Sequence, residues 1–198
     1  MSTYLEDIAE FHGKFELLPP TLSTFLDEVY EFRQKFLLEE LYELQSAWHN
    51  SHLPEYLDAL VDLDYVGLGT LFLINGTDAN ILNKNDMELE HRPRLPTPIN
   101  FVANVNTLGG NLYRMFEAIR LYPTEMKFPQ AYLRELHMNI VRHSREQGLN
   151  FLEAWNRVHF CNMQKVRALR AEDSTRGSVY DVVKPPGWVK PDLADLCQ

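Results

Sequence analysis

Residues 37–48 read LLEELYELQSAW and place three glutamates, Glu39, Glu40 and Glu43, among leucines and a tryptophan. At about 100° per residue, the apolar side chains of a helix over this stretch form one stripe, made by Leu37, Leu41, Leu44 and Trp48. Glu40 borders the stripe, and Glu43 and Glu39 lie progressively further round the helix. The stretch therefore predicts a helix that buries one face and presents carboxylates along the edge of that face.

The stretch PEYLDALVDLDYVGLGT, residues 54–70, repeats this design on the following helix. Its apolar stripe consists of Leu57, Leu60, Val61 and Leu68. Glu55, Asp58 and Asp62 gather on one flank, within an arc of roughly 60°. Because a short turn joins the two helices, we expect them to be antiparallel neighbours whose carboxylates meet near the wall of a bundle.

The acidic pairs Glu40-x-x-Glu43 and Glu55-x-x-Asp58 allow two interpretations. They can form a solvated acidic face, in which like charges three residues apart repel by about a few tenths of a kcal/mol. Alternatively, Glu40, Glu43, Asp58 and Asp62 hold a divalent cation, which turns the repulsion into attraction. Oxygen ligands without His or Cys suit a hard ion, so the sequence favours Mg²⁺, with Mn²⁺ as the alternative.

Asp64 falls within the apolar stripe of its own helix. A buried acid needs a hydrogen-bond partner, an ion pair or a metal. We expect a hydrogen bond or an ion pair, either in the core or at a subunit contact.

Helical periodicity dominates the rest of the chain. A loop with Pro19 and Pro20 precedes the long helix, whose start Thr21 or Ser23 could cap. The tail is too rich in Pro and Gly to be helical, apart from a short extended piece at SVYDVV. The predicted fold class is all-α, a bundle of long antiparallel helices with an irregular Pro/Gly-rich C-terminal tail, with helices at about residues 3–12, 21–49, 55–74, 101–121, 129–146 and 150–170.

The charge of the chain is unevenly distributed. The net charge of −9 argues against a protein that coats a nucleic acid polymer or an anionic membrane. Residues 1–92 contain 18 Asp and Glu against 5 Lys and Arg, whereas residues 93–198 contain 10 against 14. Such a chain could hold a cation with its first half and phosphates with its second, although chance and solubility would also explain the imbalance.

No feature of the sequence indicates export or membrane insertion. The first residues, MSTYLEDIAEF, are acidic, and no apolar run approaches the roughly 18 residues that span a bilayer. The two cysteines, Cys161 and Cys197, form no CxxC motif. We therefore expect a cytoplasmic protein with reduced thiols.

Four stretches together resemble a known family: FRQKFLLEELYEL, PEYLDALVDLDYVGLGT, AWNRVHFCNMQKV and DVVKPPGWVKPDL. They are similar to the MazG-like branch of the all-α nucleoside triphosphate pyrophosphohydrolases, and most of all to its phage- and plasmid-borne members. The resemblance covers the two central helices, the helix near 151–167 and the tail. We expect a single domain over residues 1–198, in which residues 93–150 are an elaboration and residues 171–198 are the tail.

The resemblance implies Mg²⁺-dependent cleavage between the α- and β-phosphates of a nucleoside triphosphate, which yields a monophosphate and pyrophosphate. The family's E-x-x-E and E-x-x-D motifs are carried here by Glu40, Glu43, Glu55 and Asp58. Phosphoryl transfer requires charge neutralisation and a positioned nucleophile, which agrees with such a cluster. The general base stays open among Glu39, Glu43 and Glu55.

Basic and polar residues must then face the polyphosphate. On a helix through NRVHFCNMQK, Arg157 and Lys165 recur at i and i+8, and Asn162 shares a face with Lys165. The resemblance implies that Asn162 and Lys165 line the nucleotide site. Further candidates for substrate binding are Arg33, Lys35, Lys184, Lys190 and Trp188.

Some of these residues also have a purely structural interpretation. Trp188 could stack on a base, but anchoring the tail on the bundle is the more common role for such a residue. His159 is the leading site histidine, whereas His137 and His143 are expected at the surface or in packing.

Three functions stay open. The first is a nucleotide pyrophosphohydrolase, and the second is a catalytically weak bundle that binds or sequesters a nucleotide or a signalling nucleotide. The third is a purely structural helical protein. Phosphoribosyl-ATP pyrophosphohydrolases are a related group, less expected because their sequences are usually shorter and lack the KPPGW ending. The resemblance and the small-residue surface at YVGLGT both favour a homodimer or homotetramer.

Overall fold

The computed structural model describes residues 3–18, 22–75 and 93–198. It is mostly helical, which confirms the predicted fold class. The loop at Pro19 and Pro20, the cap at Thr21, and the turn after residue 75 with the start of the following connector lie outside the described residues. The helices and strands are α1 Tyr4–Lys14, α2 Leu22–Thr24 with a π-helical turn Phe25–Val29, α3 Tyr30–His49, α4 Leu53–Asn75, α5 Pro98–Leu121, α6 Lys127–Glu146, α7 Phe151–Asn162, β1 Val166–Arg167 and β2 Val182–Val183.

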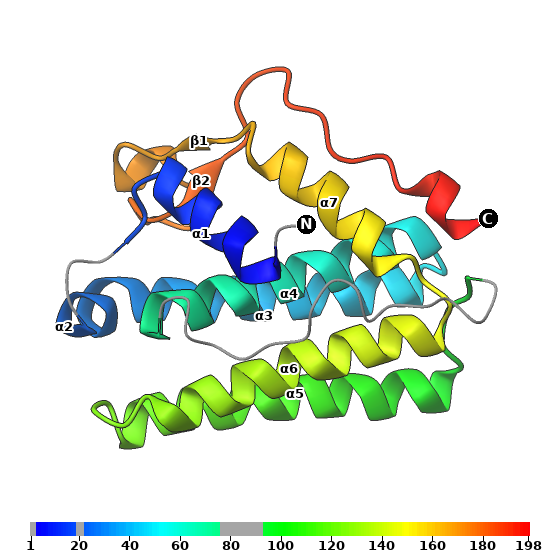
Figure 1. Ribbon diagram of the computed structural model, residues 1–198, viewed down its shortest axis with the longest axis horizontal. Helices are drawn as coiled ribbons and strands as arrows, with labels where there is room; N and C mark the ends of the chain where they lie inside the picture. Colours follow the sequence, from blue (N-terminus) through cyan, green and yellow to red (C-terminus); the bar gives the residue numbers. More distant parts are fainter. Residues whose placement is uncertain (1–2, 19–21, 76–92) are drawn as a thin grey trace.

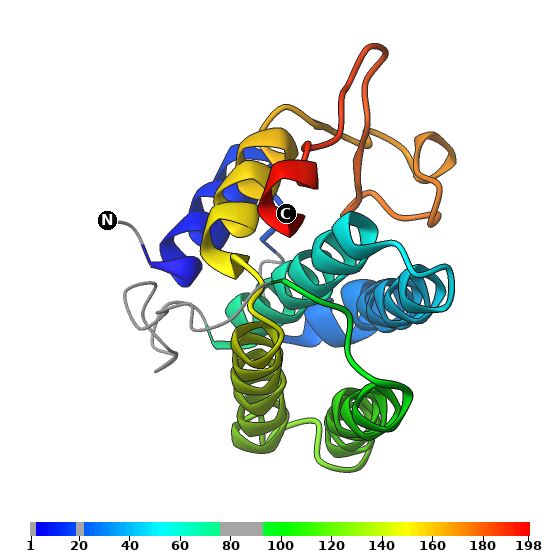
Figure 2. The same ribbon diagram turned by 90° about the vertical axis from the view of Figure 1, so that its right-hand side faces the viewer.

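The helices are arranged in layers around α4. In Figure 1, α5 and α6 form the lowest layer, α3 and α4 the middle layer, and α1, α7 and the tail the upper layer. Figure 2 shows α3, α5 and α6 nearly end-on, as expected for a bundle of roughly aligned helices. Helix α4 packs against α3 and α6 on the bundle side and against α1 and α7 on the other side.

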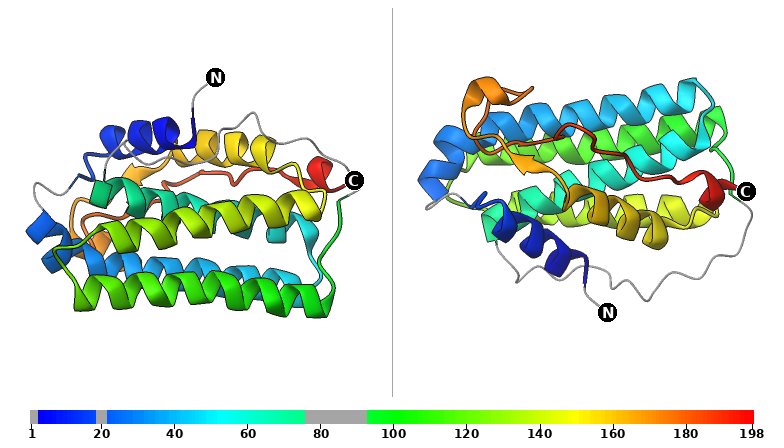
Figure 3. Two further views of the ribbon diagram at one scale, coloured as in Figure 1. Left: turned by 60° about the horizontal axis from the view of Figure 1, so that its bottom comes forward. Right: turned by 90° about the horizontal axis from the view of Figure 1, so that it is seen from above.

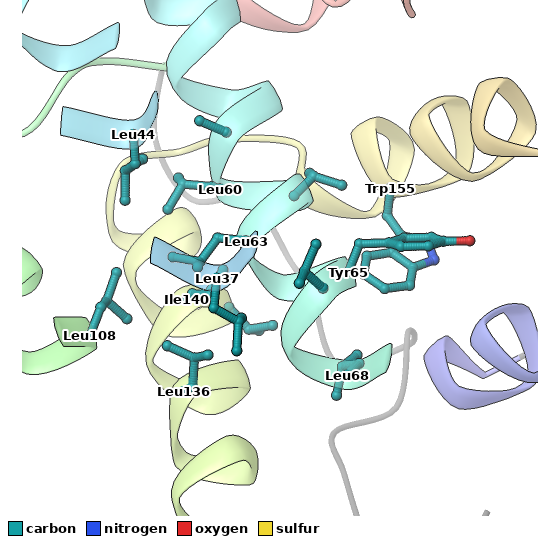
Figure 4. Packing of buried hydrophobic residues seen from close by; sticks show 14 of the residues in the cluster. Leu37, Leu44, Leu60, Leu63, Tyr65, Leu68, Leu108, Leu136, Ile140 and Trp155 are labelled. Atoms are coloured by element: carbon teal, nitrogen blue, oxygen red, sulfur yellow. The ribbon is translucent and has the colours of Figure 1, made fainter. Parts of the chain in front are cut away.

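The burial of α4 follows from this central position. Every residue from Tyr56 to Leu71 is buried except Asp58 and Asp62, which are half-buried. Its leucines meet those of α3, α5 and α6, as Figure 4 shows for Leu37, Leu60, Leu108 and Leu136. Burial of such a helix on all sides stabilises the fold through the hydrophobic effect.

Local signals explain where several helices begin. Thr3 caps α1 in a capping box with Glu6, and Thr97 caps α5 immediately before Pro98. Ser23, a candidate cap, instead lies inside the helical run and donates a hydrogen bond to Asp27.

A tight turn joins α3 and α4. Asn50 follows α3, and Ser51 has a φ of 55°, in the left-handed region. The turn reverses the chain within three residues, so α3 and α4 are antiparallel neighbours, as predicted. This arrangement brings the two acidic motifs to the same side of the bundle.

Helix α7 is shorter than predicted, because it ends at Asn162 and not near residue 170. The backbone of Gln164 and Lys165 closes a turn onto Cys161 and Asn162, and the chain then pairs as β1 with β2 of the tail. The amphipathic pattern continues to residue 169, but pairing with a distant strand replaces the helix. Strand β2 lies within SVYDVV, where a short extended piece was predicted.

The core contains a buried polar pair that connects α4 to α6. Asp64 and His137 are 1% and 0% exposed, and the His137 Nδ1 lies 2.8 Å from a carboxylate oxygen of Asp64. This confirms the hydrogen-bonded core interpretation of Asp64. His137 and His143 are both buried, so the packing role expected for them holds and the surface location does not.

The imidazole of His143 gives the fold a specific pH dependence. Burial lowers the pKa of His143 to about 4, and its Nε2 lies 2.7 Å from the Tyr56 hydroxyl. In the unfolded chain the His143 imidazole is protonated near pH 6.5, whereas in the folded chain it is protonated only near pH 4. The free energy of unfolding therefore decreases as the pH falls below 6.5. We expect a loss of about 2 kcal/mol from this residue between pH 7 and pH 5.

Urea unfolding at both pH values measures this effect. His143→Gln should reduce the loss between pH 7 and pH 5, and His49→Gln, at the exposed end of α3, should leave it unchanged. An equal loss in wild type and His143→Gln would contradict the prediction.

No described helix is both long enough and apolar enough to cross a bilayer.

Candidate active site

A cleft of about 580 Å³ lies where α3 and α4 meet α1, the end of α7 and the tail. Its volume is in the range of about 300–1,000 Å³ that small-molecule sites occupy. Seen from above, in the right-hand view of Figure 3, the tail runs over the bundle between α3 and α7. The cleft therefore combines side chains that are far apart in the sequence.

One wall of the cleft is acidic. It consists of Glu39, Glu40 and Glu43 from α3 and Asp62 from α4. Glu40 is only 5% exposed, and its Oε2 is buried without a hydrogen-bond partner among the described residues. An unsatisfied buried carboxylate oxygen is costly, so this atom requires either a proton or a positive ligand.

These carboxylates act on one another. Burial raises the pKa of Glu40, and the charges of Asp62 and Glu43 raise it further. Burial and the charge of Asp62 also raise the pKa of Glu43. The pKa of Asp62 is raised by burial, against the opposing effect of Lys165, Lys184 and Arg176. The nearby lysine and arginine side chains therefore do not fully balance the negative charge of the acidic wall.

Glu55 and Asp58 lie beside this cleft and not in it. With Glu43 they line an adjoining hollow of about 460 Å³. Burial raises the pKa of Asp58, and Asp62 and Glu55 raise it further, so Asp58 still belongs to the electrostatic cluster. Lys190 donates a hydrogen bond to Glu55. Glu43, which lines both hollows, connects the two acidic motifs.

The facing wall comes from the end of α7 and the tail, and we call it the basic wall because it carries lysine and arginine side chains, with Asp173 and Asp181 beside them. Asn162, Lys165, Arg176 and Lys184 all line the cleft. Asn162 is buried, and burial lowers the pKa of Lys165 although Asp62 favours its charged form. Asn162 and Lys165 lie together as predicted, but because of a turn and not because of a continuing helix.

Arg176 is a site residue that the sequence analysis did not identify. Its guanidinium donates two hydrogen bonds to Glu39, at 2.7 and 3.0 Å, and forms an ion pair with the buried Asp181. It also lies 3.8 Å from the centre of the Phe36 ring. Arg176 and Glu39 are separated by 137 residues, so no spacing pattern could have revealed this contact.

Other predicted binding residues have structural partners outside the cleft. Lys35 pairs with Glu31 on the exposed side of α3. Arg157 binds Glu153 and the tail residue Asp195. Neither residue lines the cleft.

Trp188 and His159 also make structural contacts. The Trp188 indole donates to the Cys161 carbonyl at 2.8 Å, a contact that anchors the tail on α7. The His159 Nδ1 lies 2.9 Å from the Tyr65 hydroxyl.

The donor set of the acidic wall fits a hard divalent cation. Within residues 3–18, 22–75 and 93–198, no three His, Cys, Asp or Glu side chains form a ready-made metal centre. Mg²⁺ does not require one, because it usually keeps several waters and binds one or two carboxylates together with substrate phosphates. The unpartnered Oε2 of Glu40, surrounded by acidic neighbours, is an oxygen that such an ion would satisfy. Glu40, Glu43 and Asp62 are therefore the residues that would hold it.

Comparison with known protein families agrees with this arrangement. Residues 9–78 match the family model described as phosphoribosyl-ATP pyrophosphohydrolase. This part of the chain is similar to that family. No curated protein and no solved structure matches the chain in the corresponding searches.

The match confirms the resemblance to the all-α pyrophosphohydrolases, whose members cleave pyrophosphate bonds and typically use Mg²⁺. It does not distinguish between phosphoribosyl-ATP and other nucleotides as substrates. The matched residues contain α3 and α4, and hence the acidic wall. They end before α7 and the tail, so the basic wall is supplied by the part of the chain beyond the match.

Proposed function

We propose that the chain is a Mg²⁺-dependent nucleotide pyrophosphohydrolase, with Mn²⁺ as an alternative ion. It cleaves the α–β phosphoanhydride of a ribo- or deoxyribonucleoside triphosphate into a monophosphate and pyrophosphate. The supporting observation is the opposition of the two walls: undercompensated carboxylates of α3 and α4 face Lys165, Lys184 and Arg176 across one cleft. A metal–polyphosphate complex carries charges of both signs and matches both walls.

The residues of this chain have separate tasks in the proposed reaction. Lys165, Lys184 and Asn162 bind and orient the phosphates, so that the anhydride lies beside the acidic wall. A Mg²⁺ ion held by the acidic wall would neutralise phosphate charge and lower the pKa of a bound water. Glu43, which is exposed and has a raised pKa, is the carboxylate we assign to accept the proton of the attacking water, so that Glu40 and Asp62 are the main ligands of the ion.

Glu39 has a different task in this proposal. Its carboxylate is engaged by Arg176, so it positions the tail over the cleft. Glu55 accepts a hydrogen bond from Lys190, and its charge raises the pKa of Asp58. The proposal includes self-association as a homodimer or homotetramer, which stays a prediction.

Product analysis tests the proposal directly. The chain is incubated with Mg²⁺ and a panel of ribo- and deoxyribonucleoside triphosphates together with phosphoribosyl-ATP. We expect pyrophosphate and the monophosphate, and Asp62→Asn should reduce kcat/KM by about 100-fold or more because charge stabilisation by a carboxylate–metal contact is lost.

Glu31→Gln is the matched control, because Glu31 is an exposed α3 glutamate that pairs with Lys35 outside the cleft. It should keep wild-type activity. Release of orthophosphate and a diphosphate would contradict the assigned bond. Nucleotide binding without turnover would contradict the enzyme proposal and favour a sequestering protein.

A further inference from the structure

The cleft contains a third region, which we call the inner corner: His12 of α1, Arg33 of α3, and Val66 and Gly69 of α4. His12, Arg33 and Val66 line the cleft. Arg33 precedes Glu40 by seven residues, so the two lie on the same face of α3 and about 10 Å apart along its axis. A nucleotide whose phosphates lie at the acidic wall would extend its base toward this corner.

Aromatic side chains surround the inner corner. Phe11, Phe36, Tyr65 and Tyr180 line the same cleft. Phe11 and Tyr65 meet edge to face, with ring centres 5.4 Å apart. Flat apolar walls of this kind accept a nucleobase, because every base has a π-face.

Arg33 is a buried cation without a direct counter-charge. It is 7% exposed, and it donates from Nε to Thr70 and from Nη2 to the carbonyl of Val66. Among the described residues, no carboxylate forms an ion pair with it. These neutral acceptors fix the guanidinium in place, and the carboxylates of Asp181 and Glu40 favour its charge without pairing with it directly, so it can still take an additional electron-rich partner.

His12 adds a buried polar atom without a hydrogen-bond partner in the described part of the chain. It is 2% exposed, and its Nδ1 makes no hydrogen bond among the described residues. Burial and the charge of Arg33 lower the pKa of His12 to about 3, so the imidazole is neutral. A neutral imidazole offers one donor and one acceptor.

Gly69 allows the two side chains to come together. A β-carbon at this position would lie 2.8 Å from the Arg33 Nη2 and 3.1 Å from the His12 Nε2. The guanidinium and the imidazole therefore both pack on the backbone of α4 where it lacks a side chain. Three elements converge on this corner, as in a built binding site.

We propose that the inner corner reads the base of the nucleotide and selects bases with a keto edge, namely guanine, uracil and thymine, over adenine and cytosine. This proposal rests on the proposed function, because it assumes that a nucleotide occupies the cleft. Arg33 can only donate hydrogen bonds. It therefore pairs with a carbonyl oxygen of the base but leaves an exocyclic amino group unpaired. The adjacent ring N–H of a keto base can then donate to the neutral His12.

The wild-type protein provides the first test. We expect kcat/KM to be about tenfold or more higher for GTP than for ATP, and for UTP than for CTP, which is the discrimination of one well-placed base contact. A ratio below about 3 in both pairs would overturn the proposal. Dissociation constants for the α,β-methylene analogues of GTP and ATP, which cannot be cleaved at that bond, should show the same preference.

Variants then assign the preference to the corner. Arg33→Gln removes the cation, and Gly69→Ala displaces it without changing any charge. Each should bring the GTP/ATP ratio below about 3. Gly67→Ala is the matched control, since its added carbon would meet Leu136 on the core side of the same helix, and it should keep the wild-type ratio.

The two proposals fail in different ways. If pyrophosphate is released equally from GTP and ATP, the base proposal falls and the enzyme proposal stands. If no nucleotide is hydrolysed but the analogues bind with the keto preference, the enzyme proposal falls and the base subsite stands. If the wild type prefers GTP to ATP and Gly69→Ala keeps this preference with a wild-type circular dichroism spectrum, the inner corner does not read the base. Gly69→Ala alone is sufficient for this test if Arg33→Gln does not fold.

Discussion

Glu40→Gln is expected to reduce pyrophosphate release by about 100- to 1,000-fold and, at the same time, to make the metal-free protein more stable by about 1–2 kcal/mol. Glutamine has the shape of glutamate but cannot supply a charged oxygen to a cation. The gain in stability follows because Glu40 is buried, has an oxygen without a partner among the described residues and lies near the charges of Asp62 and Glu43. Its raised pKa means that folding disfavours the charged carboxylate, a cost that a neutral glutamine does not have. Activity and stability should therefore change in opposite directions.

Two measurements on the same samples check this prediction. Urea unfolding in EDTA gives the stability difference, and thermal unfolding with added Mg²⁺ shows whether the ion stabilises the protein. Wild type should gain stability from Mg²⁺, and Glu40→Gln should lose most of this gain. The control Glu31→Gln should match wild type in all three readouts. Wild-type turnover in Glu40→Gln would disprove the metal assignment, and lower stability of the variant would disprove the electrostatic account.

The largest effect on stability is expected at the Asp64–His137 pair. Asp64→Ala leaves both nitrogens of a fully buried imidazole without a partner, since the His137 Nε2 already has none among the described residues. Breaking a buried pair by removing one member costs about 3–5 kcal/mol.

A double variant separates the polar loss from the lost volume. The variant Asp64→Leu/His137→Leu leaves neither member of the pair buried without its partner. Urea unfolding should therefore show that it regains at least half of the stability lost in Asp64→Ala. Asp64→Asn keeps an oxygen acceptor and should cost about 1 kcal/mol. If the double variant is as unstable as Asp64→Ala, packing and not hydrogen bonding accounts for the effect of the pair.

The local pattern was sufficient for the helices and for the acidic wall. Periodicity predicted α4, α5 and α6 with ends that differ by a few residues from the structure, and predicted as one helix the run that the structure divides into α2, a π-helical turn and α3. The short turn at Ser51 made α3 and α4 antiparallel, so the positions of Glu40, Glu43 and Asp62 followed from helix geometry alone. Asp64 was recognised as a buried acid because it interrupts an apolar stripe.

The same local logic was wrong where a distant segment competes with the helix. Helix α7 ends at Asn162 because the following residues pair with β2, about 16 residues further on, and an amphipathic pattern contains no information about that partner. For Arg157, the tail supplies a partner that the pattern also could not show. Its spacing suggested a phosphate ligand, but the tail returns with Asp195 to bind it.

Residue spacing along the chain therefore determined the helices, their antiparallel pairing and the acidic half of the cleft, because these depend on contacts within a few turns or across one short loop. The basic half and the inner corner depend on how α1, α7 and the tail fold back over α3 and α4. Arg176 meets Glu39 across 137 residues, and His12 meets Arg33 over the bare backbone of Gly69. Only the packed structure decides such contacts, because they arise from the burial of whole helices and not from the residues that finally touch.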